Sequence, residues 1–386
     1  MMRRAICGIA IGAMLVLCSV TPAFASFGFQ NHSFESLLSN ADGSPDMQAG
    51  SHPFAVTTGF KFNTKIGVTG GPVPDEDVKD IVVDLPAGLV GNASATPKCT
   101  IQQFNTRNRN ELFSGASCPD NSQIGFAEVE LTLVSAIEPA PIAFGIYNLV
   151  APPGVPAEFG LNPDSVPIVL VPEVRTGGDY GVTVVSKNTN QTQRIFGVKT
   201  TFWGVPSDPS HEGFRGECLG PEGSPFAGVK VNVGECPVGF PGKPFLRLPT
   251  SCPSDPQPTT IHADSWQNPV QSVELEGVSE VAFNHYSAGD PVGIAGCERL
   301  DFSPEVSVVP TSRAASTPTG VVVGVSLPQN ENANGLGESD LKEAVVTLPP
   351  GMSISPSAAT GLAACSDTPE PGRPEGQIAL HSAASR

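Results

Sequence analysis

The sequence lacks a long apolar run after its first twenty residues, and it lacks sustained helical periodicity. No later stretch is apolar enough to form a helix that crosses a bilayer. Apolar and polar residues instead alternate over short segments, which is the pattern of half-buried strands. Gly and Pro supply 41 and 39 residues, spread between the apolar segments. These features argue against a helix bundle and predict an all-β chain of short strands joined by frequent turns.

Recognisable catalytic motifs are also missing. The chain contains neither G-x-S-x-G nor H-E-x-x-H, and it has 6 His. Asp208, Ser210 and His211 lie within one Pro-rich loop, whereas catalytic triads are assembled from separate parts of a fold. We therefore predict a solvated turn in that loop and an ordinary hydrogen-bonded pair at His262 and Asp264. No residue is predicted to be catalytic, and the protein is predicted not to be an enzyme.

Positive charge is scarce, because 21 Lys and Arg stand against 38 Asp and Glu, giving a net charge of -17. An acidic surface repels phosphate backbones, so nucleic acid is excluded as a partner and anionic lipid is disfavoured. The same charge suits solubility outside the cell and is compatible with calcium. The expected partner is an extracellular or cell-surface polymer or protein.

The first 25 residues have the three parts of a secretory signal peptide. Arg3 and Arg4 form a basic start, residues 5–20 are apolar, and Ala23-Phe24-Ala25 matches the small-residue cleavage site. We expect an exported protein, extracellular or at the cell surface, with no membrane span in the mature chain. The alternative is that this segment is retained as an anchor.

Cysteine is sparse but informative. Two of the 9 Cys lie in the predicted signal peptide, and no C-x-x-C occurs, which disfavours zinc. Disulfides are the default in an exported chain. Cys99 and Cys118 are predicted to pair locally, and Cys365 is left without a partner. Two further bridges are predicted among four central cysteines, in one of three connectivities: Cys218, Cys236, Cys252 and Cys297.

One phrase occurs twice. Residues 77–88 read DVKDIVVDLPAG, and residues 340–351 read DLKEAVVTLPPG. In each copy the alternating apolar residues predict a half-buried strand. The following proline cannot continue a strand ladder, and the glycine two residues later permits a tight turn. Each copy is therefore predicted to form a strand, a stop and a turn.

The repeat extends upstream and downstream of this phrase, over roughly residues 49–99 and 314–365. An apolar segment precedes each phrase, and a cysteine follows it. Cys118 follows Cys99 by 19 residues, and the same step from Cys365 reaches position 384, near the last residue. We therefore expect a second copy that is cut short, in a fragment or a truncated reading frame. The alternative is a free thiol at a genuine C-terminus.

Further alternating segments lie between the two copies, separated by Pro-rich loops, and Asp179 is expected at a hairpin tip. Two segments have a short helical pattern, ESLLSNA (35–41) and ESDLKEA (338–344). Strands are predicted in QIGFAEVELTLV (123–134), PIAFGIYNLV (141–150), SVPIVLVPEV (165–174), GVTVVS (181–186), RIFGVKTTFWGV (194–205) and SVELEGV (272–278).

These segments favour an all-β fold of serial, immunoglobulin-like β-sandwich modules with disulfide-stapled loops. After the signal peptide at residues 1–25, a first module is predicted at residues 26–137. A larger β-rich module with a Cys-, Pro- and Gly-rich loop region follows at residues 138–305. Residues 306–386 are predicted to be a partial copy of the first module.

Two patterns suggest ligands. Asp75, Asp77 and Asp80 cluster as oxygen ligands do in calcium sites, although without EF-hand spacing, and solvated charge is the alternative. Trp266 lies near a loop and is a candidate platform for stacking on a sugar. Trp203 follows an alternating strand and is expected in the core. Calcium is the one cofactor considered.

Several phrases resemble those of uncharacterised, large, secreted β-rich repeat proteins of high-GC actinobacteria with VxLPxG modules. The resemblance covers most of residues 48–365 and implies extracellular β-rich modules in series, with more repeats downstream. It carries over no catalytic residue. The phrases are KDIVVDLPAGLVGN (79–92), YNLVAPPGVPAEFG (147–160), RTGGDYGVTV (175–184), TTFWGVPSDPSH (200–211) and LPTSC (248–252).

The function expected from these observations is non-catalytic. The chain is predicted to be an extracellular structural, adhesive or binding protein built of repeated β-sandwich modules. One alternative is the accessory N-terminal part of a secreted polysaccharide-degrading enzyme. Another is a calcium-dependent adhesion module.

Overall fold

Strands are the predominant regular elements of the chain in a computed structural model. The structure describes residues 27–107, 116–132, 138–163, 166–176, 178–218, 239, 242–286, 289–347 and 349–353. The predicted signal peptide lies outside these residues. The all-β fold class is confirmed, since helices are few and short.

Eleven strands form one large sheet: β1 (Glu35–Ser39), β2 (Ala55–Lys61), β5 (Val78–Asp84), β7 (Gln123–Leu131), β8 (Ala140–Asn148), β9 (Phe159–Leu161), β10 (Ile168–Val174), β11 (Val182–Ser186), β12 (Ile195–Trp203), β14 (Pro258–Ser265) and β15 (Val278–Phe283). Three small pairs join β3 (Thr64–Ile66) with β4 (Pro72–Pro74), β6 (Val90–Gly91) with β13 (Leu246–Arg247), and β16 (Glu305–Pro310) with β17 (Val321–Ser326). The helices are α1 (Ile101–Phe104) and α2 (Val273–Glu276), with 3-10 turns η1 (Asp120–Ser122), η3 (Pro209–Phe214), η4 (Gly216–Cys218) and η5 (Cys297–Arg299).

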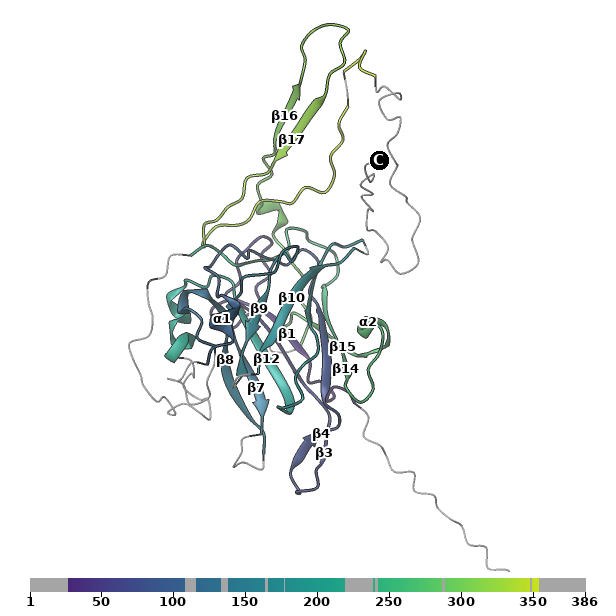
Figure 1. Cartoon of the computed structure of the whole chain (residues 1–386). Coiled ribbons are helices and arrows are strands. Elements are labelled where there is room, and N and C mark those ends of the chain that lie inside the picture. The colour runs from purple at the N-terminus through teal and green to yellow at the C-terminus, as the bar shows by residue number, and fades with distance from the viewer. Residues whose placement is uncertain are drawn as a thin grey trace, which may run out of the picture.

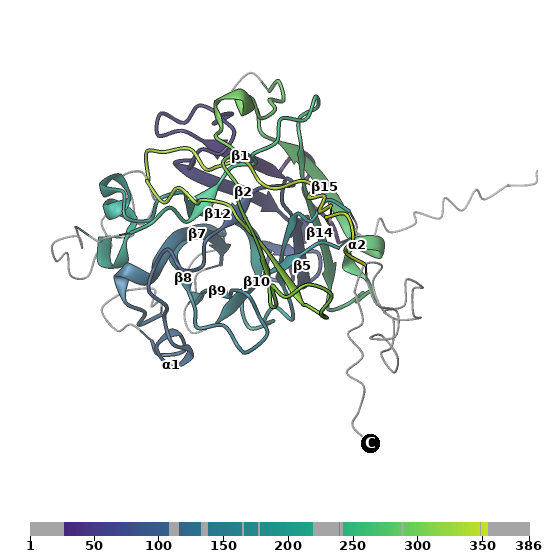
Figure 2. The ribbon, with the colours of Figure 1, turned by 90° about the horizontal axis from the view of Figure 1, so that it is seen from above.

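The large sheet curls until its two edges meet. Its order is β1-β2-β12-β7-β8-β9-β10-β11-β5-β14-β15, with antiparallel neighbours. The hydroxyls of Ser36 on β1 and Thr259 on β14 are 2.8 Å apart. The Leu38 N–H of β1 donates to Asn284 Oδ1, just after β15, at 3.1 Å. Seen from above, the strands therefore follow one another around a nearly complete ring (Figure 2).

Side-chain alternation explains where the filled core lies. Ala127, Val129 and Leu131 of β7 are buried, while the glutamates between them are only partly covered. These inward residues pack in one cluster with apolar residues of β8: Ile142, Phe144 and Ile146. The predicted strands at 123–134, 141–150, 165–174, 181–186 and 194–205 are confirmed, as is the hairpin tip at Asp179 between β10 and β11.

The sheet joins residues from both sides of position 137, where a module boundary was predicted. β7 comes before this position and β8 after it, yet Ala127 pairs directly with Phe144. β2 likewise pairs with β12, and β5 with β14. The observed unit is one nearly closed sheet built from residues 35–283, and serial immunoglobulin-like modules are not confirmed.

The two copies of the repeated phrase share a turn but not a strand. Each has a Pro-x-Gly turn, at residues 86–89 and 349–352, in which the fourth N–H donates to the first carbonyl at 3.1 Å. The turn glycines have φ values of 88° and 89°, which glycine adopts without steric cost. Residues 78–84 form β5, whereas residues 341–347 form no strand. The strand predicted in the second copy is therefore wrong over these residues.

The partners available to each copy account for this difference. β5 lies between β11 and β14 and is hydrogen-bonded to both. Residues 341–347 pair with no strand in the described part of the chain, and their side chains are exposed. They follow the β16–β17 hairpin, which projects away from the large sheet (Figure 1). An ion pair of 3.0 Å between Arg247 and Asp340 ties this region to the loops of the sheet.

Three local predictions are corrected. ESLLSNA contains a strand, β1, because its residues pair with β2, as Leu38 does with Val56. ESDLKEA contains no helix. SVELEGV contains helix α2 in place of a strand, and its Val273 packs in one cluster with Val82 and Val185. Pairing and packing between distant residues override the local patterns in these segments.

Candidate functional site

The closed sheet surrounds an apolar cavity of about 530 Å³. Its lining comes from seven strands of the large sheet, from the β6–β13 pair with its neighbours at residues 89–93 and 245–246, and from the loop at residues 156–157. Inward side chains of β5 and β11, such as Val83 and Val184, face it from one side. Side chains of β12 and β2, such as Val198 and Phe60, face it from the other.

The burial pattern shows that the described residues leave this interior partly open. The inward residues of β10 and β11, including Ile168, Leu170 and Val184, are only partly buried although they point into the sheet. On the β7 side, the inward residues Ala127 and Leu131 are buried and do not line the cavity. Closely packed interiors normally leave voids no larger than a water molecule. An open apolar space of this size is therefore a candidate ligand site.

Aromatic rings close one end of the interior. Phe60, near the end of β2, lines the cavity and meets Phe29 and Phe62 edge-on, at centroid distances of 5.8 and 5.3 Å. Phe29 and Phe62 stack on each other at 5.4 Å. At the opposite end, where β12 finishes, Phe245 and Leu246 complete the lining.

Few polar groups reach the cavity. The hydroxyls of Thr58 and Thr200 bond to each other at 2.7 Å. Thr189, which follows β11, is 6% exposed, and its hydroxyl has no hydrogen-bond partner within the described residues. Glu173 is the one charged residue among the described residues of the lining. Ser186, on β11, and Asn92 also line the cavity. The site is thus mainly apolar, with a small number of polar groups.

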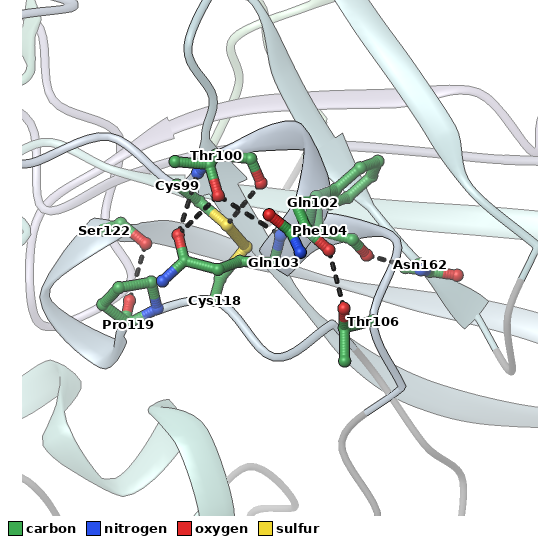
Figure 3. Close-up of a disulfide and its surroundings, with 10 residues drawn as sticks. All are labelled: Cys99, Thr100, Gln102, Gln103, Phe104, Thr106, Cys118, Pro119, Ser122 and Asn162. Atoms are coloured by element: carbon green, nitrogen blue, oxygen red, sulfur yellow. Dashed lines mark hydrogen bonds between the residues drawn. A yellow bond between two sulfur atoms is a disulfide. The ribbon is translucent and has the colours of Figure 1, made fainter.

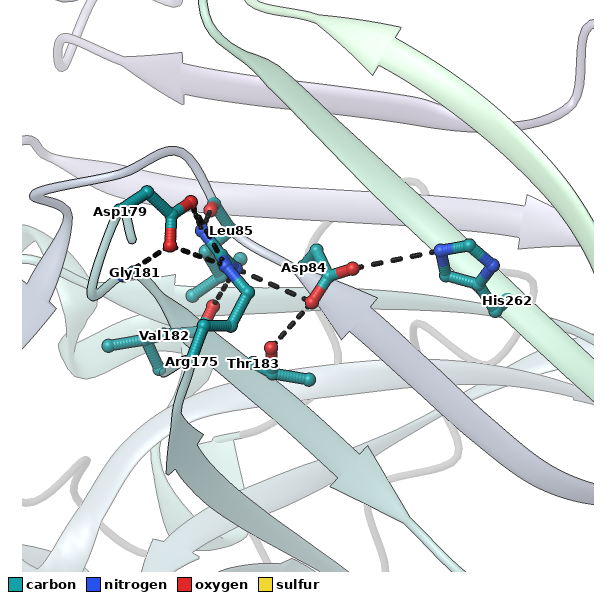
Figure 4. A network of polar contacts seen from close by, with 8 residues as sticks. All are labelled: Asp84, Leu85, Arg175, Asp179, Gly181, Val182, Thr183 and His262. Carbon is teal, nitrogen blue, oxygen red and sulfur yellow. Dashed lines mark hydrogen bonds and ion pairs between the residues drawn. The ribbon is translucent and has the colours of Figure 1, made fainter. Parts of the chain in front are cut away.

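A polar network lies beside the cavity wall and joins three strand ends (Figure 4). Arg175, after β10, donates to the carbonyls of Leu85 and Val182 at 2.9 and 3.0 Å. It also pairs with Asp179 at 2.8 Å and with Asp84 at 3.4 Å. Hydrogen bonds from Arg175 hold the pKa of Asp179 below its usual value. The network therefore clamps β5, β10 and β11 at one end.

The same network has acid, hydroxyl and imidazole groups, but not in a catalytic order. The Thr183 hydroxyl donates to Asp84, and His262 Nε2 lies 3.6 Å from the other oxygen of Asp84. The carboxylate thus stands between hydroxyl and imidazole, whereas a nucleophile must contact its base directly. His262 was predicted to pair with Asp264, and this is wrong: Asp264 instead accepts the N–H groups of Asp80 and Val270, each at 3.0 Å.

The local disulfide between Cys99 and Cys118 is confirmed, with an S–S distance of 2.01 Å (Figure 3). Thr100 caps α1 in a capping box with Gln103. The Phe104 side chain, at the end of this helix, is fully buried beside the bridge. The bridge therefore anchors a short helical loop to the outside of the sheet.

The central cysteines form a second bridge, between Cys252 and Cys297, with an S–S distance of 2.05 Å. Cys218 is also disulfide-bonded. Cys236 and Cys365 lie outside the described residues, so the remaining connectivity stays a prediction. Bridges do hold the loops around the sheet, as the Pro- and Gly-rich composition indicated.

The three candidate calcium ligands engage separate partners. Asp80 pairs with Lys79 and accepts the Asn188 N–H at 2.7 Å. Asp77 accepts Gln267 Nε2 at 3.0 Å. Burial raises the pKa of Asp75. No group of three or more His, Cys, Asp or Glu among the described residues is placed to hold a metal ion.

The proposed sugar platform, Trp266, is partly buried. Its indole N–H donates to the Thr189 carbonyl at 2.8 Å, and the Lys79 ammonium lies 5.7 Å from the ring centroid. One ring face is therefore covered by a cation, which leaves less surface for a sugar. The indole instead holds Thr189 in place beside the cavity.

Trp203 lies in the core, as predicted, under the loop that carries Asp208 and Ser210. His211 stacks on it at 4.9 Å, and the Arg215 guanidinium lies 4.8 Å from its ring centroid. Burial lowers the pKa of His211 to about 4. The loop forms η3, capped by Asp208, which accepts the Ser210 N–H at 2.9 Å. Its histidine is buried, so the solvated turn predicted there is corrected to a structural cap.

Sequence reasoning did not find the cavity. Its lining residues alternate along strands as core residues do, so the pattern is the same for a filled and an unfilled interior. Only closure of the sheet, with inward side chains too short to meet across it, creates the space.

Comparisons with known proteins give no match, either to a family model, to a curated protein or to a solved structure. Among the described residues, none of the helices is long and apolar enough to span a membrane.

Proposed function

We propose that this chain is an exported, non-catalytic binding protein whose nearly closed sheet takes up an apolar ligand. The observation that carries the proposal is the cavity of about 530 Å³ with its apolar lining. Small-molecule sites are typically clefts of about 300–1,000 Å³, lined mainly by apolar side chains with a few polar groups. An unfilled apolar interior forfeits packing contacts that a bound molecule would restore.

A fluorescence titration tests the proposal. Phenylnaphthylamine, an apolar dye that brightens out of water, is expected to bind the folded protein saturably. Val184→Trp places a large side chain in the cavity and is expected to weaken dye binding by at least about tenfold. Val322→Trp makes the same change on β17, where Val322 is 62% exposed, and is expected to leave the affinity unchanged.

Circular dichroism establishes that each variant is folded before its affinity is compared. The proposal fails if the folded wild-type protein binds no dye. It also fails if the Val184→Trp and Val322→Trp variants bind the dye equally well.

A structural or adhesive role is a second candidate, and the β16–β17 hairpin favours it. The hairpin register puts four exposed valines on one face: Val306, Val308, Val323 and Val325. We also propose that the chain contains modules in series. The β16–β17 pair precedes the second copy of the phrase, just as the β1–β2 pair precedes the first copy. Exposed apolar patches often mark interaction sites.

Sedimentation with purified cell-wall polymer tests this second role. Wild-type protein is expected to sediment with the polymer, and Val308→Lys combined with Val323→Lys is expected to remain in the supernatant. Addition of EGTA tests calcium-dependent adhesion, and competition by soluble polysaccharide tests the accessory-domain alternative. Equal sedimentation of both proteins would remove the hairpin from this role.

A further inference from the structure

The β16–β17 hairpin, which projects from the large sheet (Figure 1), matches the β1–β2 pair in sequence and in pairing. Residues 53–62 align with residues 318–327, with proline at the first position of each segment and glycine at the seventh. β17 therefore takes the place of β2. Each of these strands pairs on one side with the strand that precedes it, β1 or β16.

The other edges of β2 and β17 differ. β2 pairs with β12 along its whole length, from Ala55 to Lys61. β17 has no second partner among the described residues. It also contains no charged residue and no proline, which are two of the devices that protect exposed strand edges, whereas β16 carries Glu305 and Pro310. The free edge of β17 is therefore open to a further strand.

The register shows which backbone groups this edge offers. The Thr311 N–H donates to the Gly320 carbonyl at 2.8 Å, which makes this a hydrogen-bonded pair. The next pair, Pro310 with Val321, is a non-hydrogen-bonded one, because proline has no N–H. The two kinds of pair alternate along an antiparallel ladder. Every second residue of β17 from Val321 onward, including Val323, therefore points its N–H and carbonyl groups to the free edge.

The faces of the two hairpins correspond as well. In β2, Thr58 and Phe60 face the interior of the large sheet. The matching residues of β17 are Val323 and Val325, which are apolar but 38% and 41% exposed. The exposed valine face is thus the face that neighbouring strands cover in the large sheet.

A charge on β16 indicates what an incoming strand should carry. In the large sheet, Lys199 of β12 and Glu35 of β1 both pair with Gly59 and meet across β2 at 2.9 Å. Glu305 of β16 lies on the same face as Gly324, the counterpart of Gly59, and has no ion-pair partner in the described part of the chain. A strand with a basic residue opposite Gly324 would therefore meet a free carboxylate.

We propose that the free edge of β17 binds an extended segment of a partner protein, which runs antiparallel to β17 as β12 runs antiparallel to β2. Main-chain hydrogen bonds supply the affinity of such strand addition, and alternate side chains supply its specificity. The apolar side chains of the segment extend the valine face, and a basic residue pairs with Glu305. This surface is separate from the cavity, so the proposal does not depend on ligand binding there.

Fluorescence anisotropy of a labelled peptide tests the proposal. The peptide has the sequence of residues 194–204, because β12 fills the equivalent edge in the large sheet. It is expected to bind the full-length chain saturably, whereas a peptide of the same composition in scrambled order is not. Failure of the peptide in its native order to bind would overturn the proposal.

Two proline variants locate the binding edge. Val323→Pro removes an N–H from the free edge of β17 and is expected to weaken peptide binding at least about tenfold. Val308→Pro changes the directly opposite residue of β16, whose N–H points to the outer edge of that strand, and is expected to leave the affinity unchanged. Each variant removes one valine from the same face, so the comparison isolates the edge. Equal losses in the two variants would contradict the proposal.

A charge exchange tests the ion pair without altering the backbone. Glu305→Lys is expected to weaken peptide binding about threefold, because exposed ion pairs contribute modestly. Lys199→Glu in the peptide is expected to weaken binding to the wild-type chain by a similar factor, and the two changes combined are expected to restore it. Losses that simply add in the combination would contradict the proposed arrangement of the partner strand.

Discussion

The two copies of one phrase give an internal comparison between a covered and an uncovered strand segment. Val82 in the first copy and Val345 in the second occupy the same place in the phrase, and they are 1% and 80% exposed. Both copies make the same Pro-x-Gly turn. Local sequence is therefore enough to specify the turn, whereas the strand also requires neighbours on both sides.

The largest difference between the copies is expected from placing a charge at these two positions. Val82→Asp buries an unpaired carboxylate against Val185 and Val273, so it is expected to cost more than about 4 kcal/mol of unfolding free energy. Val345→Asp is expected to change that free energy by less than about 0.5 kcal/mol. Urea denaturation followed by circular dichroism measures both. Equal losses would mean that the second copy is covered in solution.

The second-largest difference is expected at acid pH, which should destabilise the closed sheet and leave the region of the second copy unaffected. His211, 2% exposed in the η3 loop, stacks on Trp203 and has a pKa lowered by burial to about 4, while residues 302–353 contain no histidine. The unfolded chain takes up this proton near pH 6.5 and the folded chain only near pH 4, so stability falls as the pH drops through this window. The loss from this group is expected to be about 2–3 kcal/mol by pH 4.5.

His211→Phe keeps the ring on Trp203 and removes the titration. Between pH 7.5 and about 4.5, the unfolding free energy of the wild type is expected to fall by about 2–3 kcal/mol more than that of this variant. Carboxylates distant from His211 titrate alike in both proteins and cancel in the difference. Parallel curves would show that His211 is not buried in its neutral form.

The turn glycines are expected to give the smallest difference. Gly88→Ala places a methyl group 3.1 Å from Pro249 Cβ at a φ of +88°, which is expected to cost about 1–2 kcal/mol. Gly351 has the same conformation but no atom within 4 Å of an added Cβ. Gly351→Ala is therefore expected to leave the main urea transition unchanged. A shift in that transition would couple the second copy to the closed sheet.

Features governed by neighbouring residues could be predicted from the sequence. Both Pro-x-Gly turns, the hairpin tip at Asp179 and the Cys99–Cys118 bridge depend on short separations, and all are present. The individual strands between residues 123 and 205 were also recognisable, because alternation is a local signal.

Features governed by distant pairing were not predictable in the same way. β2 pairs with β12, and β5 pairs with β11 and β14, each roughly 100 residues or more further along the chain. Alternation gives each strand a face but does not say which strand will pair with it. Closure of the sheet, and so the cavity, depends on the sum of these pairings.

The open and the packed parts of the sheet interior also differ in which strands lie opposite, although their own sequence patterns are alike. β7 and β8 bring Ala127, Phe144 and Ile146 together in a packed cluster. β10 and β11 carry equally apolar residues, yet their inner side chains border open space. Similar patterning thus yields a packed core on one side and an open cavity on the other, according to what lies opposite.

Xenon tests the existence of that space most directly, because the gas enters apolar cavities and is visible by diffraction. Crystals pressurised with xenon are expected to show gas atoms inside the sheet, among Val83, Leu170 and Val198, and none there in Val184→Trp crystals. Wild-type side chains found packed together across the interior, with no xenon between them, would contradict the account.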